Sequence, residues 1–110
     1  MLRDELIQQD DLPHLRGSRD PMTSQVYFPF RMVAADGSLR VCEPLALSRQ
    51  GVLITWTRMG KQCFGQIDLP EGVRVQAPLD DGDHRSGDQY VLDVVAGDAA
   101  EASWRFKREQ

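Results

Sequence analysis

The stretch from Gln50 to Leu79 constrains the fold most, because it holds three strand-like runs separated by two tight turns. The first run, residues 51–57, is rich in β-branched and aromatic residues and ends near Gly60, which can supply the positive φ of a short reversal. In residues 61–69, apolar and polar side chains alternate with the period of two that is typical of a strand. Pro70-Glu71-Gly72 ends this run, and the alternation resumes afterwards. The pattern predicts a three-stranded antiparallel meander.

Two more strand-like runs follow the meander. In residues 89–95 and 102–107, every second residue is again apolar, so that one face of each run is apolar. A glycine-containing loop separates the two runs. Five short strands with this glycine punctuation predict an all-β fold, a small five-stranded OB-type barrel over residues 49–110.

The first 24 residues are predicted to form a short N-terminal helix and a linker. Leu2, Leu6 and Ile7 lie at helical spacing, and the pattern breaks at Asp10-Asp11, before Pro13. A helix this short is marginal in water, so we expect it to dock on its own domain or on a partner, or to fray. Proline, glycine, serine and charged residues dominate residues 12–24, which favours an extended linker that adds little to the core.

Residues 25–48 are predicted to form a hairpin laid against the barrel. Three aromatic side chains beside a proline begin it, in the segment Val26 to Arg31. Asp36-Gly37 between two apolar runs is a strong turn signal. Pro44 in the second arm indicates an extended edge rather than a central strand.

Composition limits the classes of function. A chain of 110 residues with a net charge of −4 suffices for one domain, and its cationic residues are scattered, which argues against a nucleic-acid partner. A nucleic-acid-binding OB module, with Trp56 and Phe64 as stacking platforms, remains the alternative function. No segment approaches the roughly 20 apolar residues of a membrane span, and the N-terminus lacks the apolar core of a signal peptide. We therefore expect a cytoplasmic protein with no membrane partner.

The residues that could carry catalysis are few and scattered. His14 and His84 both lie in segments that are predicted to be loops, and Cys42 and Cys63 show no CxxC spacing, so inert packing is the expected role of both cysteines. The acidic run around Asp80 lacks the spacing of an EF-hand. We expect no independent enzyme activity and no cofactor.

The chain resembles a known family over about residues 25–95. The resemblance rests on Tyr27-Phe28-Pro29-Phe30-Arg31, Asp36-Gly37-Ser38, residues 47–57, residues 64–79 and Ser86-Gly87-Asp88. They resemble the acyl-CoA-associated OB-fold proteins that carry a rubredoxin-like zinc ribbon before the barrel. That family has two cysteine pairs flanking the aromatic segment, whereas this chain has Asp20 and Thr23, then Ala34 and Gly37, or with a one-residue shift Val33 and Asp36 for the second pair. Such residues cannot form a four-coordinate sulfur site. We therefore expect a metal-free, degenerate zinc-ribbon-like hairpin that depends on the packing of Tyr27, Phe28, Phe30 and Met32.

The resemblance implies a non-catalytic accessory subunit of an acyl-CoA enzyme with a thiolase fold or a related fold. The expected partner-binding residues are Tyr27, Phe28, Pro29, Phe30 and Arg31 of the aromatic segment, with Leu2 and Leu6 of the N-terminal helix. Whether the aromatic cluster is core or interface stays open at this point. Arg49, Arg58 and Lys61 are candidate contacts for CoA phosphates or for acidic residues of the partner, with solvated charges near a strand edge as the alternative.

Overall fold

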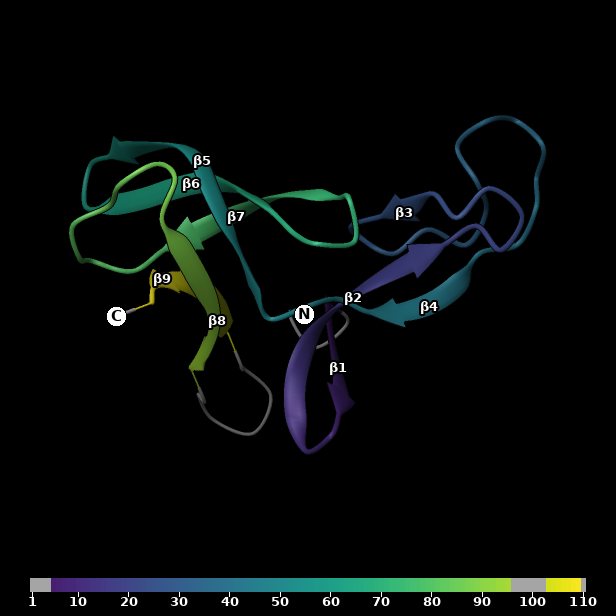
Figure 1. Cartoon of the computed structure of the whole chain (residues 1–110), viewed down its shortest axis with the longest axis horizontal. Helices are drawn as coiled ribbons and strands as arrows, with labels where there is room; N and C mark the ends of the chain where they lie inside the picture. The colour runs from purple at the N-terminus through teal and green to yellow at the C-terminus, as the bar shows by residue number, and fades with distance from the viewer. Residues whose placement is uncertain (1–4, 96–102, 110) are drawn as a thin grey trace.

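A computed structural model describes residues 5–95 and 103–109, and it contains two sets of strands (Figure 1). A four-stranded sheet, here called the N-terminal sheet, comes first and a closed five-stranded barrel follows. The sheet consists of β1 (Leu6–Gln9), β2 (Leu12–Arg19), β3 (Val26–Tyr27) and β4 (Glu43–Ala46). The barrel consists of β5 (Gln50–Met59), β6 (Gln62–Asp68), β7 (Arg74–Leu79), β8 (Gln89–Val95) and β9 (Ser103–Arg108).

The barrel confirms the all-β, OB-type prediction. Its strands close in the order β5-β6-β7-β9-β8, with β5 paired to both β6 and β8. Every pair is antiparallel except β7 and β9, which are parallel and share the single register pair Leu79↔Phe106. The predicted period of two is visible as burial, because alternate residues of β6 and β7 point inward. Among the residues that fill the interior are Leu53, Cys63, Ile67, Val75, Leu79, Tyr90, Leu92 and Phe106.

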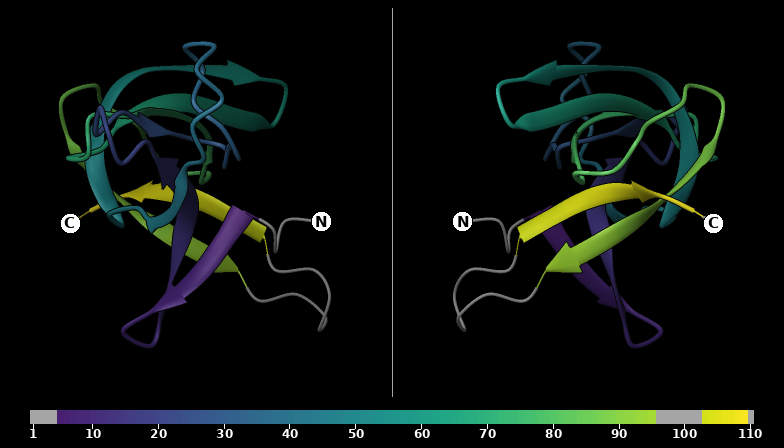
Figure 2. Two further views of the ribbon diagram at one scale, coloured as in Figure 1. Left: turned by 90° about the vertical axis from the view of Figure 1, so that its right-hand side faces the viewer. Right: turned by 90° about the vertical axis from the view of Figure 1, so that its left-hand side faces the viewer.

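The prediction of a short N-terminal helix is wrong in the part that the structure describes. Residues 6–9 form β1, which pairs antiparallel with the first half of β2, from Leu6↔Leu15 to Gln9↔Leu12. Asp10 and Asp11 form the two-residue turn, with φ values of 55° and 63°. Positive φ at both turn residues matches the right-handed twist of a hairpin, and aspartate tolerates it better than most residues. Figure 2 shows this hairpin, in purple, projecting on the same side of the molecule as β8 and β9. Residues 1–4, including Leu2, lie outside the described residues.

Replacing Asp10-Asp11 by Asn-Gly is expected to stabilise the protein by about 0.5–1 kcal/mol, or a few degrees in Tm. Asparagine and glycine adopt the positive φ of this turn more readily, and the change removes two adjacent like charges. Thermal denaturation followed by far-UV circular dichroism measures the shift. A lower Tm than that of the unchanged protein would contradict the turn geometry.

The predicted linker over residues 12–24 is also wrong, because most of it is a strand. The second half of β2 pairs with β4 on one side and with the short β3 on the other. Leu15, Gly17 and Ser18 of β2 are buried. A Cβ on Gly17 would lie 2.7 Å from the Tyr27 carbonyl oxygen, so the neighbouring strand can approach only because this residue is glycine.

The predicted turn at Asp36-Gly37 is confirmed. Val33 and Val41 form an antiparallel bridge across it, and Gly37 has the positive φ that the reversal requires. The edge role of Pro44 is confirmed as well, since within the described ranges β4 is paired with β2 alone.

One hydrophobic core joins the N-terminal sheet to the barrel. Leu15, Val26 and Leu47 belong to the same buried cluster as the barrel interior. At the junction, the Leu47 N–H donates to the Leu15 carbonyl oxygen at 2.9 Å. The backbone N–H and the hydroxyl of Ser48 both donate to one Glu71 carboxylate oxygen, at 2.9 and 2.6 Å. The two sets of strands are therefore fixed relative to one another.

Candidate partner-binding surface

The aromatic segment lies between the N-terminal sheet and the barrel and is only half-buried. The Phe28 ring packs edge-on against Trp104 of the barrel, with 6.0 Å between ring centroids. The Phe30 ring lies under the Arg16 guanidinium, whose central carbon is 3.9 Å from the ring centroid. The segment is therefore neither pure core nor a free aromatic patch.

Tyr27 and Arg31 are held by contacts within the chain. The Tyr27 hydroxyl accepts a hydrogen bond from the Ala35 N–H at 3.2 Å, and the Arg31 guanidinium lies 5.5 Å from the Tyr27 ring centroid. The Arg31 N–H donates to the Ser18 hydroxyl at 3.0 Å. Arg31 and Pro29 nevertheless remain exposed, unlike the three half-buried aromatic side chains of the segment.

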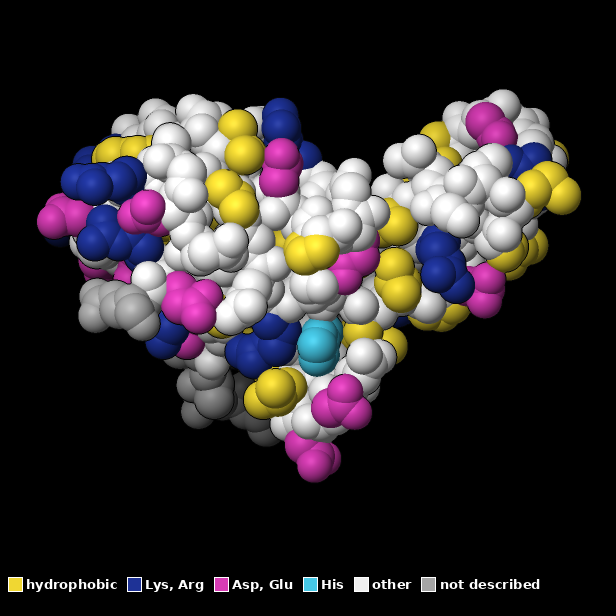
Figure 3. Space-filling model, viewed as in Figure 1, with side chains coloured by type: hydrophobic (Ala, Val, Ile, Leu, Met, Phe, Trp, Pro, Cys, Tyr) yellow, Lys and Arg dark blue, Asp and Glu magenta, His cyan; other side chains and the backbone are white. Residues whose placement is uncertain are grey.

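Two loops at the outer end of the N-terminal sheet, residues 20–25 and 32–42, expose large apolar side chains. We call them the distal loops. Their exposed apolar residues are Met22, Met32, Leu39 and Val41. The expectation that Met32 packs inside is therefore wrong, because its side chain projects into solvent. Figure 3 shows hydrophobic side chains, in yellow, at the outer end of the N-terminal sheet.

Leu39 combines exposure with an uncommon backbone conformation. Its side chain is 73% exposed. Its φ is 62°, a region that is disfavoured for a residue with a γ-branched side chain. The surrounding turn enforces this conformation, because the Ser38 N–H donates to Asp36 and the Arg40 N–H donates to the Ser38 hydroxyl. No pattern in the sequence indicates this conformation, which depends on the path of the turn.

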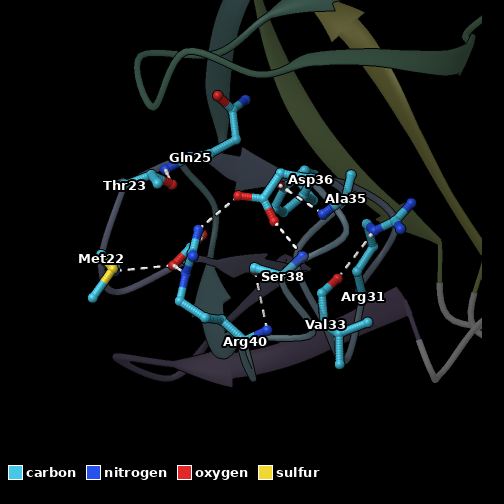
Figure 4. A network of polar contacts seen from close by, with 11 residues as sticks. Met22, Thr23, Gln25, Arg31, Val33, Ala35, Asp36, Ser38 and Arg40 are labelled. Carbon is cyan, nitrogen blue, oxygen red and sulfur yellow. Dashed lines mark hydrogen bonds and ion pairs between the residues drawn. The ribbon is translucent and has the colours of Figure 1, made fainter.

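A charged network that the sequence analysis did not predict joins the two distal loops (Figure 4). The Arg40 guanidinium donates through Nη2 to Asp20 Oδ2 at 2.7 Å and to Asp36 Oδ2 at 2.7 Å. Its Nε lies 3.2 Å from both oxygens of Asp20. The Asp20 side chain is 1% exposed, and its Oδ1 accepts a further hydrogen bond from the Met22 N–H at 2.9 Å. The hydrogen bonds from Arg40, then that from Met22, hold the pKa of Asp20 far below its usual range.

The residues of this region do not fit a zinc site. Of the ligand positions that the resemblance implies, Asp20 and, with the one-residue shift, Asp36 carry side chains that suit zinc, and Arg40 binds both carboxylates. Alanine and glycine at residues 34 and 37 offer no ligand atom. Over the described ranges, three or more histidine, cysteine or acidic side chains are nowhere gathered as metal ligands would be.

Leu6 and the predicted cationic residues lie in separate places. Leu6 is half-buried and packs against the shared core. Arg49 lies just before β5 and donates to the Leu92 carbonyl oxygen at 2.9 Å, whereas Arg58 and Lys61 are exposed at the far end of β5 and in the turn after it. The structure therefore does not bring the three cations together in one spot.

The histidines are hydrogen-bonded within the fold, and the cysteines are buried in it. His14 Nδ1 lies 2.8 Å from the Leu47 carbonyl oxygen. The His84 ring lies between the Tyr90 hydroxyl and the Asp80 carbonyl oxygen, each 2.9 Å from one ring nitrogen. Burial raises the pKa of Tyr90. Cys42 and Cys63 are free and buried, as predicted. The His84 side chain and Tyr90 are both fully buried, so this hydrogen-bonded pair is not open to an incoming molecule.

A hollow of about 560 Å³ lies where β7 and β9 diverge. Leu79, Trp104 and Arg105 are among the residues that line it. The two strands share only the one register pair beside it, and no pattern in the sequence indicates the hollow. Within the described residues, no helix is both long and apolar enough to cross a membrane.

Comparisons with known proteins identify a similar fold. No family model and no curated protein matches the sequence significantly. Among solved structures, a chain of the Ltp2-ChsH2(DUF35) aldolase is similar with a TM-score of 0.69 and 14% sequence identity. The similarity covers 86% of this chain and 84% of that chain. At this identity the similarity establishes the fold.

Proposed function

We propose that this protein is a non-catalytic accessory subunit that binds an acyl-CoA-metabolising enzyme, of thiolase fold or of a related aldolase or hydratase type. One observation carries the proposal. The fold is similar to that of a chain of the Ltp2-ChsH2(DUF35) aldolase over 86% of this protein, a span too long for the barrel alone. The name of that neighbour joins two proteins, one of them labelled DUF35, in one aldolase. The engaged histidines and buried cysteines support a binding role over a catalytic one.

The proposed contact surface consists of the exposed part of the aromatic segment and the distal loops. Pro29 and Arg31 supply an exposed edge beside the half-buried rings. The exposed apolar side chains of the distal loops supply the non-polar area that the centre of a protein interface needs. The occupant that we propose is the catalytic subunit. Arg58, at the end of β5, and Lys61, in the turn after it, lie far along the barrel from the junction with the N-terminal sheet. They are candidates for a separate contact with CoA phosphates or acidic residues.

Purification under native conditions tests the proposal. We expect the tagged full chain to recover an acyl-CoA enzyme in near-stoichiometric amount. The complex should re-form from the two purified proteins on size exclusion with light scattering. A chain that stays monomeric with such enzymes would contradict the proposal, as would turnover of CoA thioesters by the isolated chain. Salt-dependent binding of single-stranded oligonucleotides would favour the alternative, a nucleic-acid-binding module.

Leu39→Gly is expected to weaken binding to the recovered enzyme at least about tenfold while leaving the fold intact. Glycine adopts the φ of 62° without strain, so the variant loses an exposed apolar side chain and no internal contact of the core. Leu12→Ser is the matched control, because Leu12 is 47% exposed but lies at the start of β2, at the opposite end of that strand from the distal loops. Isothermal titration calorimetry of both variants measures the difference. Equal affinities for the two variants would place the interface elsewhere.

A further inference from the structure

The Asp20 carboxylate is enclosed by protein on all sides. Its side chain is 1% exposed, and its two oxygens receive hydrogen bonds from Arg40 and from the Met22 N–H. A charged group in such a place is very costly unless a partner of opposite charge and further hydrogen bonds compensate it. The hydrogen bonds from Arg40 and Met22 meet this requirement, so the ion pair is a condition for this loop to fold as it does.

Arg40 reaches Asp20 from the other distal loop, 20 residues along the chain. The same guanidinium binds Asp36, which lies across the turn at the tip of residues 32–42. A guanidinium is planar, always charged and carries five donors, so one side chain can link two carboxylates in fixed directions. Loop 20–25 is itself closed by hydrogen bonds from the Asp20 N–H to the Gln25 carbonyl oxygen and from the Ser24 N–H to the Asp20 carbonyl oxygen. Arg40 therefore links two already closed loops.

The two distal loops hold the positions at which the resembled family carries its two cysteine pairs, namely Asp20 and Thr23 in the first loop and Ala34 and Gly37, or Val33 and Asp36, in the second. Arg40 is not one of these positions. We propose that Arg40 performs here the cross-linking that a metal ion would perform, by tying loop 20–25 to loop 32–42 through Asp20 and Asp36. The N-terminal sheet of this protein then folds without a metal. The link between the two loops is a property of the chain by itself and needs no bound partner.

Asp20→Asn is expected to lower Tm by roughly 10 °C, because it leaves the Arg40 charge without its buried partner. Asp68→Asn is the matched control. Asp68 and Arg74 form the same type of two-bond pair, with distances of 2.6 and 3.0 Å, but on the surface, with side-chain exposures of 40% and 53%. We expect its loss to change Tm by less than about 3 °C. Equal shifts for the two variants would overturn the proposal.

Metal content and chelation test the same proposal on the unchanged protein. We expect elemental analysis to find well under one zinc ion per chain, and EDTA to leave Tm unchanged. Stoichiometric zinc, or a Tm that falls with the chelator, would overturn the proposal even if Asp20→Asn does not fold. Asp36→Asn removes only the half-exposed arm of the network and should fold with a smaller loss of Tm than Asp20→Asn.

A double-mutant cycle shows whether Asp20 acts through Arg40. Once Asp20→Asn has removed the pair, adding Arg40→Met should cost much less than Arg40→Met costs alone. Hydrogen exchange should show the loss of protection concentrated at amides of the distal loops, such as Ser24, Ala34 and Cys42, rather than in the barrel. Additive effects of the two substitutions would overturn the proposal.

Acid should weaken the same link. The pKa of Asp20 lies far below its ordinary value in the folded protein, so the unfolded chain binds a proton more readily. The stabilisation is therefore fully present above about pH 4–5 and is lost progressively as the pH falls through the unfolded and then towards the folded pKa. The Tm values of the unchanged protein and of Asp20→Asn should accordingly converge at acid pH. A difference in Tm between the two proteins that stays constant down to pH 2 would contradict a charge-based link.

Discussion

Replacing Leu15 with alanine is expected to lower Tm by about 15 °C and to unfold the N-terminal sheet and the barrel in a single transition. Leu15 is fully buried and belongs to the cluster that contains the barrel interior. Its backbone carbonyl accepts the Leu47 N–H at the junction of the two sets of strands. Removing a buried leucine side chain typically costs about 2–5 kcal/mol, and each kcal/mol corresponds to roughly 4 °C in a domain of this size.

Leu12→Ala is the control for this prediction, because Leu12 lies on the same strand but is 47% exposed. Its Tm should stay within about 2 °C of that of the unchanged protein. Calorimetry, with tryptophan fluorescence and far-UV circular dichroism as separate probes, measures both variants. Two transitions in Leu15→Ala, one of them at the original Tm, would show that the barrel does not depend on the N-terminal sheet.

Gly51→Ala is expected to destabilise the protein by about 3 kcal/mol or more, although alanine has the better strand propensity. A Cβ on Gly51 would lie 2.6 Å from the Asp68 carbonyl oxygen and 2.6 Å from Ile67 Cγ2. A third contact, to Leu69 Cδ2, would measure 2.8 Å. The carbonyl oxygen belongs to the β6 backbone and cannot rotate away, so β5 and β6 would have to separate where the barrel is closed.

Gly82→Ala is the matched control for the same substitution outside the barrel. The nearest atoms to a Cβ at residue 82 are those of the Asp80 carboxylate at 3.5 Å, an ordinary van der Waals distance. The change should therefore be neutral or slightly stabilising. Urea denaturation of both variants gives the two free energies of unfolding. Gly51→Ala as stable as Gly82→Ala would contradict the close approach of β5 and β6.

The barrel could be predicted from the sequence because its signals are local. In β6, Cys63, Gly65 and Ile67 point inward and the residues between them point outward, so the alternation that a reader sees in the sequence is the alternation of burial. The glycines at residues 60 and 72 have the positive φ values that the turn assignments required. Local chemistry and tertiary structure agree throughout this stretch.

The N-terminal sheet could not be predicted in the same way. Strand β2 has the sequence LPHLRGSR, in which proline, glycine and charges hide the strand, and its pairing depends on partners that lie up to 30 residues away. Gly17 is required by the approach of the Tyr27 carbonyl oxygen, which is a tertiary contact. The charged network was missed because Asp20 looks like one more solvated loop charge until Arg40 is placed beside it. Long-range contacts determine these features, and the periodicity of the sequence does not indicate such contacts.

The double hydrogen bond from Ser48 to Glu71 has a consequence for any complex. It locks the backbone where the chain leaves one set of strands for the other, over a molecule that extends 42 Å along its longest axis. The barrel would therefore keep a constant distance and orientation relative to any protein bound at the distal loops.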